Sequence, residues 1–303
     1  MKRFALRTRT DQLDPVTDHE EIARILTTQE FPWDINQALS FALFRTYGVP
    51  SIGNLLFHTG EFTERVQKRY DDTGLILDAI LEHGLGSAEG RSAIRRINQM
   101  HGAYSISNDD MRYVLATFVV TPVLWIKEYG WRDLTTTEVE GWANYYRALG
   151  KYMGIKQIPE SYDAFAQFMD TYERLNFAYD SGARAVADST LELLCTFPPN
   201  SYAPRFLIRQ FAWSIMDDAL LDAFGYSHPH RVVRLVSRTA LRLRGRIVCR
   251  MPVRETPKFA RELPNIRSYP DGYRVDQLGT FPRTCPVQHG SAALNPHPAA
   301  ADR

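Results

Sequence analysis

The spacing of apolar residues constrains the fold most strongly, because it follows the period of an α-helix along nearly the whole chain. Apolar side chains recur every three or four positions in 139–153, in 165–179 and in 183–194. We find neither the alternating pattern of half-buried strands nor a convincing hairpin signal. The sequence therefore predicts an all-α fold, a single-domain helical bundle.

Signals for helix starts and short breaks divide this periodic sequence. Three Ser/Thr-x-x-acid patterns, typical of capping boxes, are Thr17 with Glu20, Ser107 with Asp110 and Thr135 with Glu138. Glycine and proline mark short turns, and no long linker or internal repeat separates the periodic segments. We expect one continuous body over 17–280 and a flexible tail over 281–303.

Composition and charge exclude several classes of protein. Lys and Arg number 36 against 35 Asp and Glu, a net charge of +1 that predicts no nucleic-acid partner. The 3 cysteines are widely spaced, which argues against a disulfide framework or a zinc finger and favours the reducing cytoplasm. The amino terminus lacks the apolar core of a signal peptide. The longest apolar run, 113–126, falls short of the roughly 20 residues of a membrane span, so we expect a buried helix there.

Metal motifs with fixed spacing are largely absent. No His-Glu-x-x-His and no Glu-x-x-His occurs. The segment Asp217-Asp218-Ala-Leu-Leu-Asp222 is similar to the magnesium motif of helical prenyl-chain enzymes, but its third aspartate is one position late. Solvent-facing helix charges are the favoured interpretation, and a magnesium-dependent prenyl-chain enzyme is kept as an alternative.

One histidine lies on an apolar helix face. His101 shares a stripe with Ile94, Ile97 and Tyr104 in a predicted helix over 87–104, so its imidazole should point inward. A core histidine that is satisfied by one backbone carbonyl is one interpretation. The other is the axial ligand of a haem, which needs a neutral imidazole with one nitrogen free for iron.

The preceding predicted helix, 61–82, carries an arginine on the face that should be buried. Arg69 and Thr73 are four residues apart and so lie on one side of that helix. A buried guanidinium is costly unless an anion meets it. That anion is either a helix carboxylate such as Asp109 or Asp110, or a haem propionate; in the second case the arginine can also polarise bound oxygen. Antiparallel packing would bring this face toward the inward histidine.

The segment 231–251 reads as a basic amphipathic helix. Arginine recurs every four residues from Arg234 to Arg250, and apolar residues from Val233 to Met251 form a second face. A solvated outer face of the bundle is one interpretation. Peripheral docking to an anionic membrane surface is the other, and it would suit a lipid-like substrate.

Several of these segments together resemble a known family. The segments are Arg69-x-x-x-Thr73, Arg95-Arg-Ile-Asn-Gln-Met-His101, Ile106-Ser-Asn-Asp-Asp-Met, Trp131-Arg-Asp-Leu-Thr-Thr-Thr-Glu138, Met153-Gly-Ile155, Ile158-Pro-Glu-Ser-Tyr162 and Tyr172-Glu173. In order and spacing the chain, over about residues 30–280, is similar to the latex-clearing rubber oxygenases and MpaB-type oxygenases. The last segments look like the MpaB branch.

The resemblance implies a globin-like helical core around a b-type haem and an enzyme that uses O2 to cleave carbon–carbon double bonds in isoprenoid chains. It implies that His101 is the axial iron ligand and that Arg69 and Thr73 lie at the haem pocket. Two departures accompany it: Asp72 stands where rubber-cleaving members can carry a distal lysine, and no glutamate matches their proposed base.

The resulting hypothesis is a haem b-dependent oxygenase that acts on an apolar, isoprenoid-like substrate with O2. His101 would bind iron, and Arg69 and Thr73 would be the catalytic pair. A haem- or lipid-binding helical protein without catalysis is the alternative from another class. His58 and His83 are candidates for a sixth iron ligand only because they are histidines.

Overall fold

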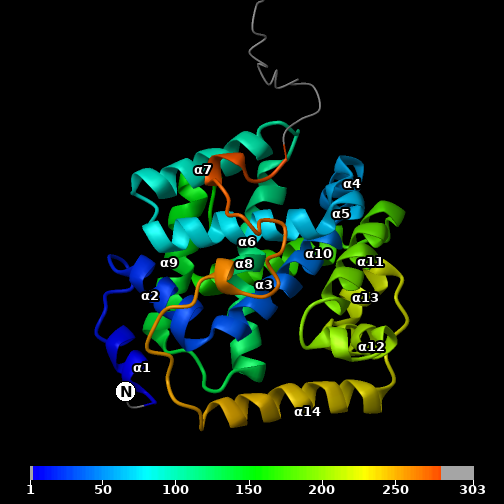
Figure 1. Ribbon diagram of the computed structural model, residues 1–303. Coiled ribbons are helices and arrows are strands. Elements are labelled where there is room, and N and C mark those ends of the chain that lie inside the picture. The colour runs from blue at the N-terminus through cyan, green and yellow to red at the C-terminus, as the bar shows by residue number, and fades with distance from the viewer. Residues whose placement is uncertain (1–2, 281–303) are drawn as a thin grey trace, which may run out of the picture.

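The computed structural model describes residues 3–280 and consists there of fourteen α-helices without a β-strand (Figure 1). The prediction of an all-α, single-domain fold is confirmed. Residues 281–303, predicted to be a flexible tail, lie outside the described residues. That tail and the domain boundary at 280 stay predictions.

The elements follow each other through short connections. The helices are α1 (Ala5–Thr10), α2 (His19–Ile25), α3 (Pro32–Tyr47), α4 (Pro50–Thr59), α5 (Glu61–Glu64), α6 (Val66–His83), α7 (Ala88–His101), α8 (Asn108–Tyr129), α9 (Thr136–Tyr152), α10 (Tyr162–Asn176), α11 (Ser181–Cys195), α12 (Arg205–Ile215), α13 (Asp218–Phe224) and α14 (Arg231–Val248). A π-helical turn, η1 (Leu26–Glu30), links α2 to α3, and 3-10 turns lie at η2 (Asn200–Tyr202), η3 (Ala260–Glu262) and η4 (Val275–Gln277).

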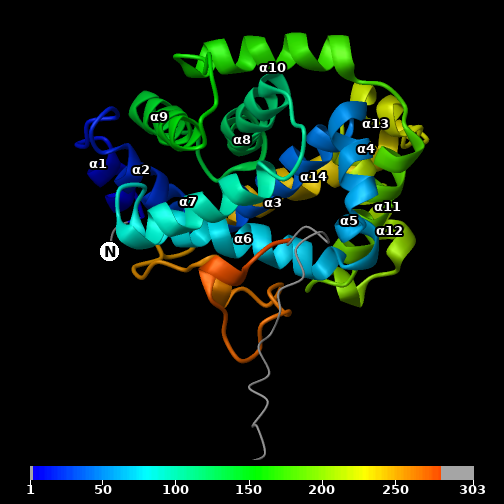
Figure 2. The ribbon, with the colours of Figure 1, turned by 90° about the horizontal axis from the view of Figure 1, so that it is seen from above.

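The centre of the bundle is the pair α3 and α8, with α10 packed on α8 and α9 packed on α2 (Figure 2). The apolar run 113–126 lies within α8, where Ala116, Val119 and Val120 are buried. The prediction of a buried helix there is confirmed. None of the helices among residues 3–280 is both long and apolar enough to span a membrane.

Two of the three predicted helix starts are confirmed. The Ser107 and Thr135 hydroxyls accept hydrogen bonds from backbone N–H groups at the third position of α8 and α9, and Thr135 forms a complete capping box. The prediction at Thr17 was wrong. The N-cap of α2 is Asp18, one residue later, and the Thr17 N–H donates to Asp14 in the preceding turn instead of to Glu20.

A C-terminal strap, residues 253–280, runs across α6 and α7 (Figure 1). The buried Asp71 carboxylate accepts the N–H groups of Arg267 and Ser268 at 3.0 and 2.8 Å. The Arg96 guanidinium donates to the carbonyls of Leu278 and Thr280. Charged groups of the two helices thus satisfy backbone groups of a segment with little regular structure.

The Asp78 carboxyl lies under this strap, where burial disfavours its ionised form. Asp78 is 6% exposed and accepts the Ala260 N–H at 2.8 Å, but its Oδ2 has no hydrogen-bond donor and lies 3.6 Å from the Arg261 guanidinium. Burial raises the pKa of Asp78 to about 6 from its usual 3.8. Its contribution to stability is therefore greatest below about pH 4 and is lost as the pH rises through about 6.

We expect Asp78→Asn to stabilise the fold at pH 8 by roughly 1–2 kcal/mol and to leave stability near pH 4 unchanged. Urea unfolding at both pH values measures the difference. Glu82→Gln is the matched control, because the Arg261 side chain lowers the pKa of Glu82 and this variant should lose stability at pH 8. Equal effects of the two substitutions at pH 8 would contradict the prediction.

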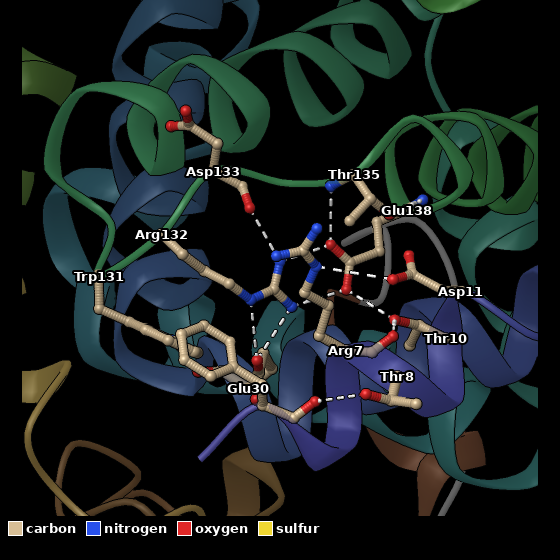
Figure 3. A network of polar contacts seen from close by, with 11 residues as sticks. Arg7, Thr8, Thr10, Asp11, Glu30, Trp131, Arg132, Asp133, Thr135 and Glu138 are labelled. Atoms are coloured by element: carbon tan, nitrogen blue, oxygen red, sulfur yellow. Dashed lines mark hydrogen bonds and ion pairs between the residues drawn. The ribbon is translucent and has the colours of Figure 1, made fainter.

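A buried polar network ties the start of the chain to α9 (Figure 3). Arg132 pairs with Glu30 at 2.9 Å and with Glu138 at 2.7 Å, and both carboxylate side chains are fully buried. Thr10 donates a hydrogen bond to Glu138 at 2.8 Å. The network joins α1, η1 and α9 across more than a hundred residues of sequence.

Candidate functional site

The candidate site lies where α6 and α7 pack together across the turn at Gly84 (Figure 1). The turn is tight because Gly84 has a φ of +85° and Gly90 lies directly against it. A Cβ at position 90 would stand 1.9 Å from the Gly84 carbonyl oxygen. This close approach brings the two helices that carry the predicted site residues into contact.

His101 is the last residue of α7, which ends three residues earlier than predicted; Tyr104 follows in a turn. The imidazole is half-buried, and its Nδ1 is fully buried without a hydrogen-bond partner. Neither ring nitrogen bonds to any residue in 3–280. The interpretation of a core histidine satisfied by a backbone carbonyl was therefore wrong. Burial, together with the charge of Arg69, lowers the pKa of His101 to about 4, so the ring is neutral at pH 7.

Arg69 lies beside this histidine without a carboxylate in direct contact. Its Nη1 donates to the Thr73 hydroxyl at 2.6 Å, and its guanidinium carbon is 5.2 Å from the centre of the Phe62 ring. It makes no ion pair with any residue in the described part of the chain. The suggested partners Asp109 and Asp110 bond elsewhere, so that interpretation was wrong.

The position of Arg69 is electrostatically unfavourable. Burial lowers its pKa, and nearby Tyr47, Asp72 and Glu61 act in the opposite direction. Arg69 and Thr73 are each half-buried, not fully buried as predicted, whereas Ile80 at the other end of the same stripe of α6 is fully buried. A guanidinium in this setting would be stabilised by an anionic ligand.

The space beside Arg69 is small and mostly apolar in its lining. It measures about 20 Å³, close to the room for one water molecule. It is lined by Ser40, Leu43, Tyr47, Phe62, Val66, Arg69, Tyr70, Thr73, Thr190, Leu193 and Leu194. A ligand larger than water requires these side chains to move apart.

Sequence reasoning missed one acidic side chain near the site. Glu61, at the start of α5, is 5% exposed and pairs with Arg65, and its charge affects Arg69. In the sequence it follows Thr59 and Gly60 and so reads as an exposed helix start. Its burial depends on the packing of α5 against α11, which local sequence does not reveal.

Other residues considered from sequence lie away from the cavity. Asp72 is buried, but it bonds to Lys68 and to the Tyr269 hydroxyl of the strap. His58 lines an open hollow of about 490 Å³ between α4 and the loop at Ser105. His83 lies at the far end of α6 beside Glu82. None of the three histidines, His101 included, is among the side chains that line the cavity beside Arg69; His101 is the one whose pKa the charge of Arg69 lowers.

The aspartates around α13 form surface ion pairs. Asp217 pairs with Arg45, Asp218 with Arg234 and Asp222 with His228. Across residues 3–280 no three His, Cys, Asp or Glu side chains are grouped as metal ligands. The favoured interpretation of surface charges agrees with these pairs, and the magnesium alternative lacks a ligand set. A haem needs no such group, because its porphyrin supplies four of the iron ligands.

Comparison with known proteins gives the family directly. Residues 42–245, more than half of the chain, match the family described as the catalytic domain of the ER-bound oxygenases mpaB/B' and rubber oxygenase. The chain belongs to this family. An "ER-bound oxygenase mpaB" of Penicillium roqueforti (strain FM164) is 32% identical over 245 residues, which cover 74% of this chain and 81% of that protein.

A second relative is the "ER-bound oxygenase mpaB'" of Penicillium brevicompactum, 31% identical over 248 residues that cover 75% of this chain and 58% of the relative. The family resemblance seen in the sequence is confirmed. The matched range contains His101, Arg69 and Thr73, and membership makes the chain an oxygenase, an oxidoreductase that acts on a small molecule with O2.

Some family-like segments have structural roles in this oxygenase. Glu173 pairs with Arg45 of α3 and accepts the Tyr113 hydroxyl of α8 at 2.9 Å, and Tyr172 donates to Asp110 at 2.8 Å. These bonds join α3, α8 and α10. The segment 131–138 forms the buried network of Figure 3. The resemblance therefore rests partly on residues that hold the bundle together.

Proposed function

We propose that this oxygenase depends on haem b, with His101 as the axial ligand of iron, and acts on an apolar, unsaturated, isoprenoid-like substrate. The observation that carries the proposal is the buried, partnerless Nδ1 of a neutral imidazole next to a guanidinium without an ion pair. A neutral ring with a free lone pair is what iron ligation requires, and a lone cation suits an anionic propionate.

The side chains of this site have separate roles in the proposal. The bound haem would supply the activation of O2. His101 holds the cofactor, and the low pKa of its imidazole keeps it available as a ligand across neutral pH. Arg69, oriented by its bond to Thr73, binds a propionate or orients the oxygen reactant. The ring of Phe62 beside Arg69 helps to exclude water.

The small size of the cavity beside Arg69 means that haem can bind there only if the cavity expands. The space beside Arg69 is about 20 Å³, whereas ligand cavities usually measure roughly 300–1,000 Å³. Long side chains from α3, α5, α6 and α11 close it. Cofactor binding in this proposal therefore separates these side chains, and haem binding should rigidify the region where α6 meets α11.

An apolar substrate of this class concentrates in membranes. We therefore include in the proposal that the protein meets its substrate through peripheral membrane contact by the segment 231–251. The relatives are called ER-bound by name. A cytoplasmic location is compatible with Cys195 and Cys249, which are both free thiols.

The experiment combines an optical spectrum with oxygen consumption. The purified protein should show a Soret band and consume O2 when a polyprenyl substrate is added. Arg69→Met should keep the Soret band and slow oxygen consumption by about 100-fold, the usual effect of removing one oriented donor. Arg95→Met, at an exposed position of α7, is the matched control and should stay near wild type.

Two outcomes would contradict the proposal. A colourless protein that takes up no haem on reconstitution rules out the cofactor. A pigmented protein that consumes no oxygen with any unsaturated apolar substrate rules out catalysis and leaves a carrier.

A further inference from the structure

Helix α14 has an outward apolar surface, which we call the α14 stripe. It consists of Val232, Val236, Leu243 and Ile247 of the helix and of Met251 just after its end, each more than half exposed. The four helical residues fall on one side of a helix with 3.6 residues per turn. Figure 1 shows α14 along the lower edge of the molecule, with no described element on its outer side.

The orientation of α14 is fixed by small residues on its inner side. Only Ser237, Leu241 and Gly245 of the helix are buried. A Cβ at position 245 would lie 2.7 Å from the carbonyl oxygen of Tyr129, so the helix axis approaches the end of α8 as closely as glycine permits. The helix cannot rotate its larger apolar side chains inward without losing this contact.

Ion pairs reinforce the same orientation. Arg234 pairs with Asp218 at 2.7 Å and Arg244 with Asp34 at 2.6 Å, and Arg242 pairs with Glu128. Two arginines of the four-residue series, Arg234 and Arg242, thus attach the helix to the rest of the bundle. The apolar face, which in most bundles is buried against the core, is the face left outside.

Arg238 donates to the Ser214 carbonyl, and the other three arginines flank the α14 stripe without carboxylate partners. Arg231, Arg246 and Arg250 are exposed and form no ion pair with any residue in 3–280. Helix α14 contains no Asp or Glu. At its edge Trp33, 38% exposed, stacks 4.0 Å from Arg244, and indole rings of this kind favour the membrane interface.

We infer that the α14 stripe docks in the plane of an anionic bilayer surface. The apolar side chains enter the acyl boundary, and Arg231, Arg246 and Arg250 meet lipid phosphates. The charge pattern disfavours a second copy of the chain as occupant, because two α14 helices face to face would bring unpaired arginines together without any acid. This inference gives the residues and lipid class for the peripheral contact proposed above, and it holds whether or not the protein binds haem.

The test is co-sedimentation of the full chain with phosphatidylcholine vesicles, with and without phosphatidylserine. Wild type should bind the anionic vesicles and bind more weakly at high salt. Leu243→Asp with Ile247→Asp should weaken binding at least about tenfold through the apolar contact. Arg231→Gln with Arg246→Gln should weaken it by about tenfold or more through the charge.

Matched controls separate this face from general surface effects. Leu175→Asp on α10, 78% exposed, and the exposed Arg95→Gln on α7 should bind vesicles like wild type. Helicity measured by circular dichroism should be unchanged in every variant. Absence of binding to anionic vesicles, or equal binding by the α14 and control variants, overturns the inference. So does a dimer that only the α14 variants dissociate. A Soret band kept in the α14 variants separates this result from the fate of the haem proposal.

Discussion

His101→Ala should yield a folded protein that has lost its Soret band, with haem content reduced at least about tenfold. The Nδ1 of this imidazole is buried without a hydrogen-bond partner, and no other histidine among residues 3–280 lies at the site to replace it. Haem quantification by the pyridine haemochrome method, alongside circular dichroism, measures the effect. Added imidazole should restore part of the band by occupying the space left by the ring.

The control for this variant is His58→Ala, because His58 lines the open hollow and among residues 3–280 hydrogen-bonds only to the Asn54 carbonyl. It should keep wild-type pigment. Full haem and an unaltered spectrum in His101→Ala would show that another residue binds the iron and would remove the basis of the proposed function.

Arg132→Met should lower the free energy of unfolding by about 3–5 kcal/mol, the usual cost of removing one partner from a buried ion pair. It leaves the carboxylates of Glu30 and Glu138 buried together without their shared ion-pair partner (Figure 3). Burial already raises the pKa of Glu30, so this group has little tolerance for the loss. Urea unfolding followed by circular dichroism gives the measurement.

The matched control is Arg174→Met, which breaks an exposed pair with Asp170 on α10 and should cost less than about 1 kcal/mol. Adding Glu30→Gln and Glu138→Gln to Arg132→Met should recover part of the loss, because the uncompensated charges disappear. If Arg132→Met destabilises the protein no more than Arg174→Met, the network contributes little to stability.

Helix positions and the residues of the candidate site were predictable because both depend on local periodicity. A histidine and an arginine on inward stripes of consecutive helices must approach each other if the helices pack across a short turn, and Arg69 does lower the pKa of His101. Which hydrogen bonds these two side chains form could not be predicted from the sequence. Whether Nδ1 has a partner depends on neighbours distant in sequence.

The burial of α6 and the orientation of α14 illustrate the same limit. Asp71 is buried because it accepts hydrogen bonds from backbone N–H groups 196 and 197 residues away. No local sequence pattern predicts such a partner. In α14 the periodicity identified an apolar face correctly. The close fit of Gly245 against α8 turns this face outward. Periodicity alone does not predict this, because it assumes that an apolar face is buried.

The C-terminal strap determines when α6 and α7 can complete their folding during synthesis. The helices that carry Arg69 and His101 complete their packing only when Leu278, 0% exposed, has joined them. During synthesis these helices emerge early and must wait for nearly two hundred further residues. A nascent chain halted before the strap would therefore present α6 with the acidic side chains of Asp71, Asp72 and Asp78 uncovered.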